Sequence, residues 1–366
     1  MKELNIVPRG ALLIRNGTIE EVGPSRRVEN LAGARGAREI DATGRVIMPA
    51  FVDADVALVA PGVAGIRLMS RRKALARAAA AASECARYGC LAVGAHTRSA
   101  VDLQNIRKVL RVHQALQSKP MRIRSIFSPQ FPPSRTPSQI PDALISKWLP
   151  AILSRKLASV VELTVDGPEP WPDISLLRTV AIAAAEIGFA IRLRSSGHLE
   201  RAHLDLALAA GAIGIVAPMD SVRSFAGPLA AVGCIRVIPA SEGFDDAGQA
   251  AAAIRGAIDE GAAIALTSSY RLSAPSSLNM QYLLHLAVHR LGLTAEEAIT
   301  ATTWNAACSL RLSRATGSLE PGKSADLLLM EVSDYRDLAR RVGHHDVSLV
   351  MRAGQIVTRS PALNVD

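Results

Sequence analysis

The chain has 366 residues, of which 49% are hydrophobic and 20% charged, which is typical of a globular protein and excludes a disordered one. Its formal net charge is +9, but the basic residues are dispersed and aromatic residues make up only 4%, which argues against a nucleic-acid-binding surface. No apolar run is long enough for a membrane span, and the N-terminus lacks a signal-peptide core. We therefore expect a cytoplasmic protein with neither a membrane nor a nucleic-acid partner.

The first 47 residues predict short strands with tight turns. Asn16-Gly17 lies between two apolar stretches, which is a strong signal for a two-residue hairpin turn. Residues 39–44 predict another strand and turn. They lead into the segment 45–57, where an apolar strand carries Asp53 and Asp55 near its carboxyl end. Because side chains alternate along a strand, we expect both carboxylates on one face.

Residues 48–317 alternate between apolar, β-rich runs and Ala/Leu-rich helical stretches. The expected strands are 47–55, 90–96, 121–127, 159–165, 189–194, 212–217, 234–239 and 262–268. The expected helices include 72–88, 102–117, 142–155, 174–187, 199–210, 246–260 and 277–291. Eight such units predict an α/β fold, a (β/α)8 TIM-like barrel with its site at the carboxyl ends of the strands, here called the mouth. An open doubly wound sheet would give the same alternation.

The C-terminal part returns to short strands. Thr294 and Glu297 form a capping box that opens a last helix, which we expect to end near Leu310. Strands are predicted at 325–330 and 347–351, with a hairpin over 352–357. Since both chain ends are β-rich and too short to fold alone, we predict one composite β-sandwich built from residues 1–47 and 318–366 beside the barrel of residues 48–317.

Several segments carry family signatures. The run Gly317-Ser318-Leu319-Glu320-Pro321-Gly322-Lys323-Ser324-Ala325-Asp326-Leu327 is similar to the segment that ends amidohydrolase barrels, and residues 293–307 are similar to the helix before it. Residues 45–57 resemble the first barrel strand, which in the family ends in a His-x-His pair. Asp334-Tyr335-Arg336-Asp337-Leu338 is similar to imidazolonepropionases in particular. The chain thus resembles the amidohydrolase superfamily, which implies hydrolysis of carbon–nitrogen bonds in cyclic amides and a homodimer.

The resemblance also implies where a metal site would be. Active members hold zinc or iron through the His-x-His pair, two further histidines and an aspartate, and the metal activates a water. The matching positions here are Asp55, Ala57, Arg194, Ala217 and Ser269. A guanidinium has no lone pair to give and repels a cation. We therefore predict a degenerate site with no metal, no cofactor and no confident catalytic residue.

The polar residues that remain at the strand ends suggest another use for the mouth. We hypothesise that Arg194 occupies the metal position and forms a salt bridge with Asp53 or Asp55. A positive, hydrogen-bonding mouth would suit a small anionic or amide ligand. The candidate ligand-binding residues are His96, Gln130, Arg192 and Arg194.

Two functions stay open at this point. One is a non-catalytic homologue that binds a small molecule. The other is an active hydrolase of the imidazolonepropionase type with a non-standard site, in which Asp53 or Asp55 acts as the base on water. His285 and His289 are spaced as in zinc-binding helices, but no Glu adjoins the first of them, so we interpret both as structural.

Overall fold

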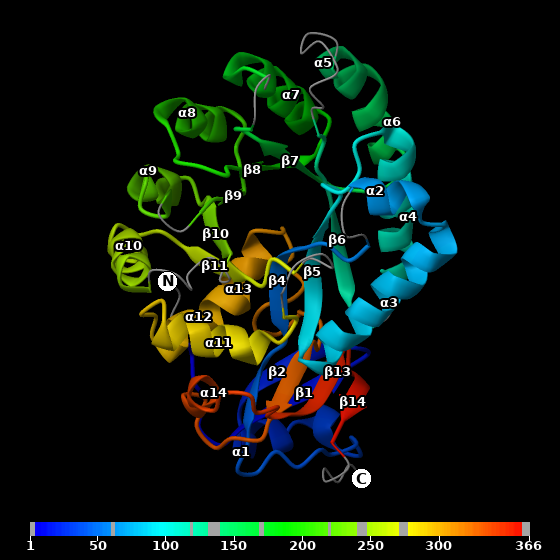
Figure 1. The fold of residues 1–366 in the computed structure, drawn as a ribbon. Helices are drawn as coiled ribbons and strands as arrows, with labels where there is room; N and C mark the ends of the chain where they lie inside the picture. The colour runs from blue at the N-terminus through cyan, green and yellow to red at the C-terminus, as the bar shows by residue number, and fades with distance from the viewer. Residues whose placement is uncertain are drawn as a thin grey trace.

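The computed structural model describes residues 4–59, 63–117, 120–130, 140–167, 172–218, 221–239, 247–270 and 277–360. Eight parallel strands form its central sheet, in chain order, with helices around them (Figure 1). The strands are β4 Phe51–Val56, β5 Cys90–His96, β6 Arg122–Phe127, β7 Val160–Thr164, β8 Ala190–Arg194, β9 Gly214–Val216, β10 Ile235–Pro239 and β11 Ile264–Thr267. β11 also lies against β4, so the sheet is a nearly closed barrel and the open-sheet alternative is wrong.

The helices follow the predicted alternation. The longer ones are α3 Arg71–Arg87, α4 Leu103–Leu116, α7 Ile174–Glu186, α8 Arg201–Ala209, α10 Ala247–Asp259 and α11 Met280–His289. Shorter ones are α1 Ser25–Glu29, α2 Val63–Leu68, α5 Ile140–Ala143, α6 Leu149–Leu153, α9 Ala226–Ala231 and α14 Asp337–Arg340. A 3-10 turn covers Ala32–Ala34 and a π-helical turn covers Leu144–Trp148. Within the described ranges, no helix has the length and apolar character needed to cross a membrane.

Three predicted elements need correction. The strand expected at 47–55 is two strands, because Val46–Pro49 (β3) belongs to another sheet and the barrel strand begins only at Phe51. The amide of Ala50 still donates to the Asp326 carbonyl, in line with the pairing of β3 with β12, whereas the next amide, of Phe51, donates to the Gly89 carbonyl beside the barrel strand β5. Residues 39–44 form a turn without a strand. The last helix is interrupted at Thr303, where φ is −128° and ψ is −85°, giving α12 Ala295–Thr302 and α13 Trp304–Cys308.

Strands from both chain ends lie together at one end of the barrel (Figure 1). β1 Gly10–Arg15 and β2 Thr18–Pro24 form a hairpin, and a second sheet has the order β14-β13-β12-β3. Its C-terminal strands are β12 Leu327–Met330, β13 Val347–Arg352 and β14 Gln355–Arg359. An isolated bridge between Thr18 and Ser324 joins the hairpin to the chain before β12.

Both predicted hairpin turns are present. Asn16 and Gly17 have φ values of 52° and 79°, and Ala353 and Gly354 have values of 47° and 73°, which is the conformation of a two-residue turn with both central residues left-handed. The turns pack closely: a Cβ on Gly17 would lie 2.7 Å from the Ala353 carbonyl oxygen. Glycine is therefore required at residue 17 both by its backbone conformation and by this contact.

The barrel interior changes from apolar to charged along its axis. Small and branched side chains fill the layer farther from the mouth, and Leu310 and Leu312 from the chain after α13 pack against them. Val160 of β7 and Ala190 of β8 belong to this layer. Because alternate residues of a strand face the same side, the next inward positions on these two strands are Glu162 and Arg192.

Candidate functional site

Two neighbouring barrel strands place opposite charges at the mouth. Glu162 of β7 pairs in register with Arg192 of β8, and both side chains are completely buried. Arg194 lies two residues further along β8, on the same face as Arg192. Buried charges are stable only when they are paired. Two arginines and one carboxylate do not balance, so these side chains require a further partner from elsewhere in the barrel.

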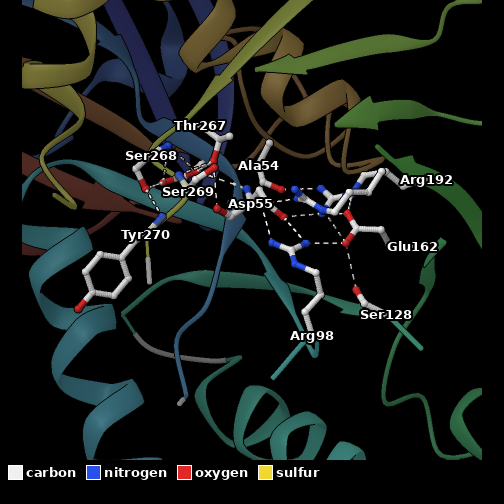
Figure 2. Close-up of polar contacts among 12 residues, drawn as sticks. Ala54, Asp55, Arg98, Ser128, Glu162, Arg192, Thr267, Ser268, Ser269 and Tyr270 are labelled. Atoms are coloured by element: carbon white, nitrogen blue, oxygen red, sulfur yellow. Dashed lines mark hydrogen bonds and ion pairs between the residues drawn. The ribbon is translucent and has the colours of Figure 1, made fainter. Parts of the chain in front are cut away.

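Asp55 and Arg98 supply those partners. Arg98, directly after β5, donates from Nη1 and Nη2 to the two carboxylate oxygens of Asp55, at 3.1 and 2.8 Å. Its Nη1 also lies 2.5 Å from Oε1 of Glu162. Figure 2 shows Arg98 between the two carboxylates, with Ser128 donating to Glu162 from the other side.

The two arginines of β8 also bridge both carboxylates. Arg192 donates to Asp55 Oδ1 at 2.7 Å, to Glu162 Oε2 at 2.7 Å and to the Ala54 carbonyl at 2.7 Å. Arg194 donates to Asp55 Oδ2 at 2.6 Å and to Glu162 Oε1 at 3.3 Å. The hypothesised salt bridge of Arg194 with Asp53 or Asp55 is thus confirmed, with Asp55 as the partner. We call Asp55, Arg98, Glu162, Arg192 and Arg194 the charge cluster.

Electrostatics keep both carboxylates of the charge cluster ionised. Burial raises the pKa of Asp55, but the charges of Arg194 and Arg98 outweigh it and hold that pKa well below its usual 3.8. For Glu162, burial is likewise outweighed by the charges of Arg192 and Arg194, and the pKa lies below its usual 4.5. Neither carboxylate is therefore available as a proton acceptor near neutral pH.

Asp53 lies in a separate environment. Its carboxylate accepts hydrogen bonds from the hydroxyls of Thr267 and Ser268 and from the Ser268 amide at 3.3 Å. Burial raises its pKa to about 6. The pairing of β4 with β5 is irregular between Asp53 and Val56, which interrupts the alternation, so the expectation that Asp53 and Asp55 share one face is wrong. Figure 2 shows Thr267 and Ser268 on one side of Asp55 and Glu162 on the other.

The remaining candidate ligand-binding residues differ in what they contact. His96 ends β5 and is 5% exposed, and neither ring nitrogen has a hydrogen-bond partner among the described residues. Burial and the charge of Arg98 hold the pKa of His96 well below 6.5, so the ring is neutral. Gln130 donates to the carbonyls of Ser128 and Pro129, at 3.4 and 3.2 Å, within its own loop.

The other predicted positions lie in buried surroundings. Ala57 and Ala217 are buried apolar residues, and Ser269 is buried with a φ of 48° and a hydroxyl without a partner in the described part of the chain. His285 and His289 both contact the Ala339 carbonyl oxygen, at 2.8 and 3.1 Å, which confirms their structural interpretation.

The donors at the mouth do not fit a divalent metal. Within the described ranges, no three His, Cys, Asp or Glu side chains are grouped so that they could hold an ion. The oxygens of Asp55 and Glu162 are engaged by three guanidiniums, which have no lone pair and repel a cation. The assignment of individual positions to lost metal ligands stays a prediction.

The sequence interpretation missed Arg98 and Glu162. Glu162 carried a usable signal, because it is a lone carboxylate inside the apolar run Val160-Val161-Glu162-Leu163, and a buried carboxylate requires a partner. Arg98 follows a strand end by two residues and had no comparable signal. It reaches the charge cluster only through the side-chain geometry of the folded barrel.

Known proteins resemble this chain over its whole length. A protein named imidazolonepropionase from Solibacter usitatus is 29% identical over 99% of this chain and 94% of its own length. Another of that name, from Brevibacillus brevis, is 25% identical over 98% of this chain and 92% of its own length. A family model described as the amidohydrolase family matches residues 184–357. These matches support an imidazolonepropionase-like member of the amidohydrolase superfamily.

Solved amidohydrolase structures share the fold. The 5-methylcytosine deaminase from Klebsiella pneumoniae, liganded with phosphonocytosine, has a TM-score of 0.75 and 17% identity, covering 98% of this chain and 96% of its own. The N-isopropylammelide isopropylaminohydrolase from Burkholderia multivorans has a TM-score of 0.71 and 20% identity, covering 96% and 95%. At these identities the comparison shows the amidohydrolase barrel with its additional sheet, and no more.

Proposed function

We propose that this protein is a metal-free, catalytically impaired member of the amidohydrolase superfamily that binds a small anionic or amide ligand at the barrel mouth. The observation that carries the proposal is the charge cluster. Three arginines bridge Asp55 and Glu162, and they leave neither carboxylate free to ligate an ion or to accept a proton.

The proposal follows from the chemistry that hydrolysis of a cyclic amide requires. A hydroxide must be generated near neutral pH, which in metal-dependent hydrolases is done by lowering the pKa of a bound water. Here the only ionised carboxylates described in the cluster have lowered pKa values, and neutral His96 makes no hydrogen bond to either of them. The guanidiniums are donors only, which suits binding and orientation of a ligand and not activation of water.

A second candidate is an active hydrolase of cyclic amides. It is favoured by the end-to-end similarity to proteins named imidazolonepropionase. It also has one potential base, because the pKa of Asp53 is raised to about 6. Against this role, the carboxylate of Asp53 is completely buried and turned toward Thr267 and Ser268.

Metal analysis and a turnover assay separate the two. We expect freshly purified protein to hold far less than one equivalent of zinc or iron, and to show no imidazolone-propionate turnover above the buffer rate. As a control, the same preparation is incubated with excess zinc or iron and then desalted. Stoichiometric metal together with turnover, before or after this reloading, would overturn the proposal.

A further inference from the structure

The charge cluster has three arginines and two carboxylates, so its net charge is +1. Among the described residues, Arg98, Arg192 and Arg194 form ion pairs with Asp55 and Glu162 alone, and the three arginine side chains are 15%, 0% and 13% exposed. An uncompensated charge at such a depth is unfavourable, because protein and water around it cannot solvate it as bulk water does.

The excess charge is located at the two arginines that reach toward solvent. All three nitrogens of Arg192 donate to partners inside the barrel. Arg98 Nε and Arg194 Nη1, by contrast, make no hydrogen bond to the described residues. Burial and the neighbouring charge of Arg98 lower the pKa of Arg194 even though both carboxylates oppose this.

His96 provides an independent observation at the same place. The charges of Arg98, Asp55, Glu162 and Arg194 all act on its pKa, so the ring lies beside the charge cluster. It is buried, yet both of its ring nitrogens lack a partner in the described part of the chain. A neutral imidazole has one N–H donor, and a buried donor without a partner is costly.

We propose that a small monoanion, a carboxylate, binds at the mouth beside Arg98 and Arg194 with His96 donating to it. One negative charge neutralises the cluster, and the planar carboxylate matches the donor geometry of a guanidinium. This rests on the proposed function and selects the anionic ligand over the amide. A neutral amide would leave the excess charge uncompensated, and a dianion would exceed it.

The test compares ligands of equal shape and different charge. The full-length protein, in a low-salt buffer at pH 7.5, is titrated with propionate, with propionamide and with inorganic phosphate, and binding is followed by calorimetry and by the shift in Tm. We expect the Kd for propionate to be at least tenfold lower than that for propionamide and lower than that for phosphate. Equal or tighter binding of propionamide, or no binding of propionate, would overturn the inference.

Variants locate the site. Arg194→Gln removes the excess charge, and we expect it to abolish the preference for propionate, whereas Arg194→Lys retains it. His96→Phe, which keeps the charge balance, is expected to weaken propionate binding about tenfold. Arg201→Gln removes a charge from the exposed face of α8 and is expected to leave the Kd unchanged. Binding that is insensitive to both Arg194→Gln and His96→Phe would place the anion elsewhere and contradict the inference.

The two proposals fail in different ways. Zinc or iron with turnover in the same preparation would overturn the proposed function, whatever the result with propionate. A metal-free, inactive protein that does not prefer propionate over propionamide would overturn only the choice of a monoanion.

Discussion

Asp53 and Asp55 lie two residues apart on β4, and both are completely buried, yet their acidities are shifted in opposite directions. The pKa of Asp53 is raised to about 6, whereas that of Asp55 is held well below 3.8. The difference comes from their partners. Asp55 faces three guanidiniums, and Asp53 faces two hydroxyls and two backbone amides, which satisfy its hydrogen bonds without supplying a positive charge.

The two carboxylates also stabilise different parts of the barrel. Asp55 joins β4 to the charge cluster across the mouth. Asp53 joins β4 to the end of β11, where the described strands have no ladder between them. Thr267 donates both to Asp53 and to the Asp55 carbonyl, the latter at 3.0 Å, and the Ala57 amide donates to the Tyr270 carbonyl at 2.8 Å. The barrel is therefore closed at this seam mainly by side chains.

The largest effect is expected from breaking the charge cluster at its second carboxylate. Glu162→Met would leave three buried arginines with only Asp55, and removal of one partner from a buried ion network costs about 3–5 kcal/mol. We expect a loss of that size in the free energy of unfolding, measured by urea denaturation at pH 7. Glu186→Met, an exposed position on α7, is the matched control and should stay within about 0.5 kcal/mol of the parent.

The next prediction uses pH to separate the two carboxylates. Between about pH 4 and 6 the folded protein holds a proton on Asp53 that the unfolded chain releases, so the Asp53 contribution to stability falls as the pH rises. A shift from 3.8 to about 6 corresponds to on the order of 3 kcal/mol. As the pH rises from 4 to 7, the free energy of unfolding of Asp53→Asn should therefore increase relative to that of the parent. A difference that is constant over this range, measured by urea denaturation, would contradict the raised pKa.

Asp55 and Glu162 should show the reverse dependence. Their pKa values are lower in the folded protein than in the unfolded chain, so below about pH 4.5 the unfolded chain takes up protons first. The contribution of the charge cluster is complete above that pH and is lost as the pH falls. Acid titration of the parent and of Glu162→Met should show a steeper loss in the parent, and parallel curves would argue against the ion pairs.

A smaller effect is expected when Arg194 alone is removed. Arg194→Ala leaves two arginines facing two carboxylates, so the remaining charges balance and the cost should be about 1–2 kcal/mol, below that of Glu162→Met. We also expect no measurable zinc affinity in this variant. Unchanged stability together with a gain of zinc binding would show that Arg194 is not needed to neutralise the buried carboxylates at the mouth. Arg201→Ala serves as the exposed control.

The smallest effect should come from Thr267→Val, which removes one donor to Asp53 while preserving the shape of the side chain. We expect a loss of about 1 kcal/mol at pH 7, because a buried carboxylate loses one of its hydrogen bonds. The pKa of Asp53 should rise further, and this would appear as a shift of the pH dependence to higher values. A shift to lower values would mean that the hydroxyl does not donate to the carboxylate.

Part of the candidate site was accessible to sequence reasoning. Arg194 and Asp55 both follow from their places at the ends of predicted parallel strands, because the carboxyl ends of such strands meet at one mouth. The bridging of Asp55 and Glu162 by Arg98 was not accessible. It depends on how the strands are staggered around the barrel and on long side chains that reach across it.

The sequence by itself determined the alternation of strands and helices, the two left-handed hairpin turns and the family to which the motifs belong, because these depend on local pattern and on residue type. Only the tertiary structure decided that the chain leaves β3 at Pro49 before entering the barrel, and that Asp53 and Asp55 have different partners. An irregularity of pairing in one strand changes which side a residue faces, and local sequence does not reveal it. The charges gathered at the mouth are likewise set by contacts between residues that lie 30 to 139 positions apart in the chain.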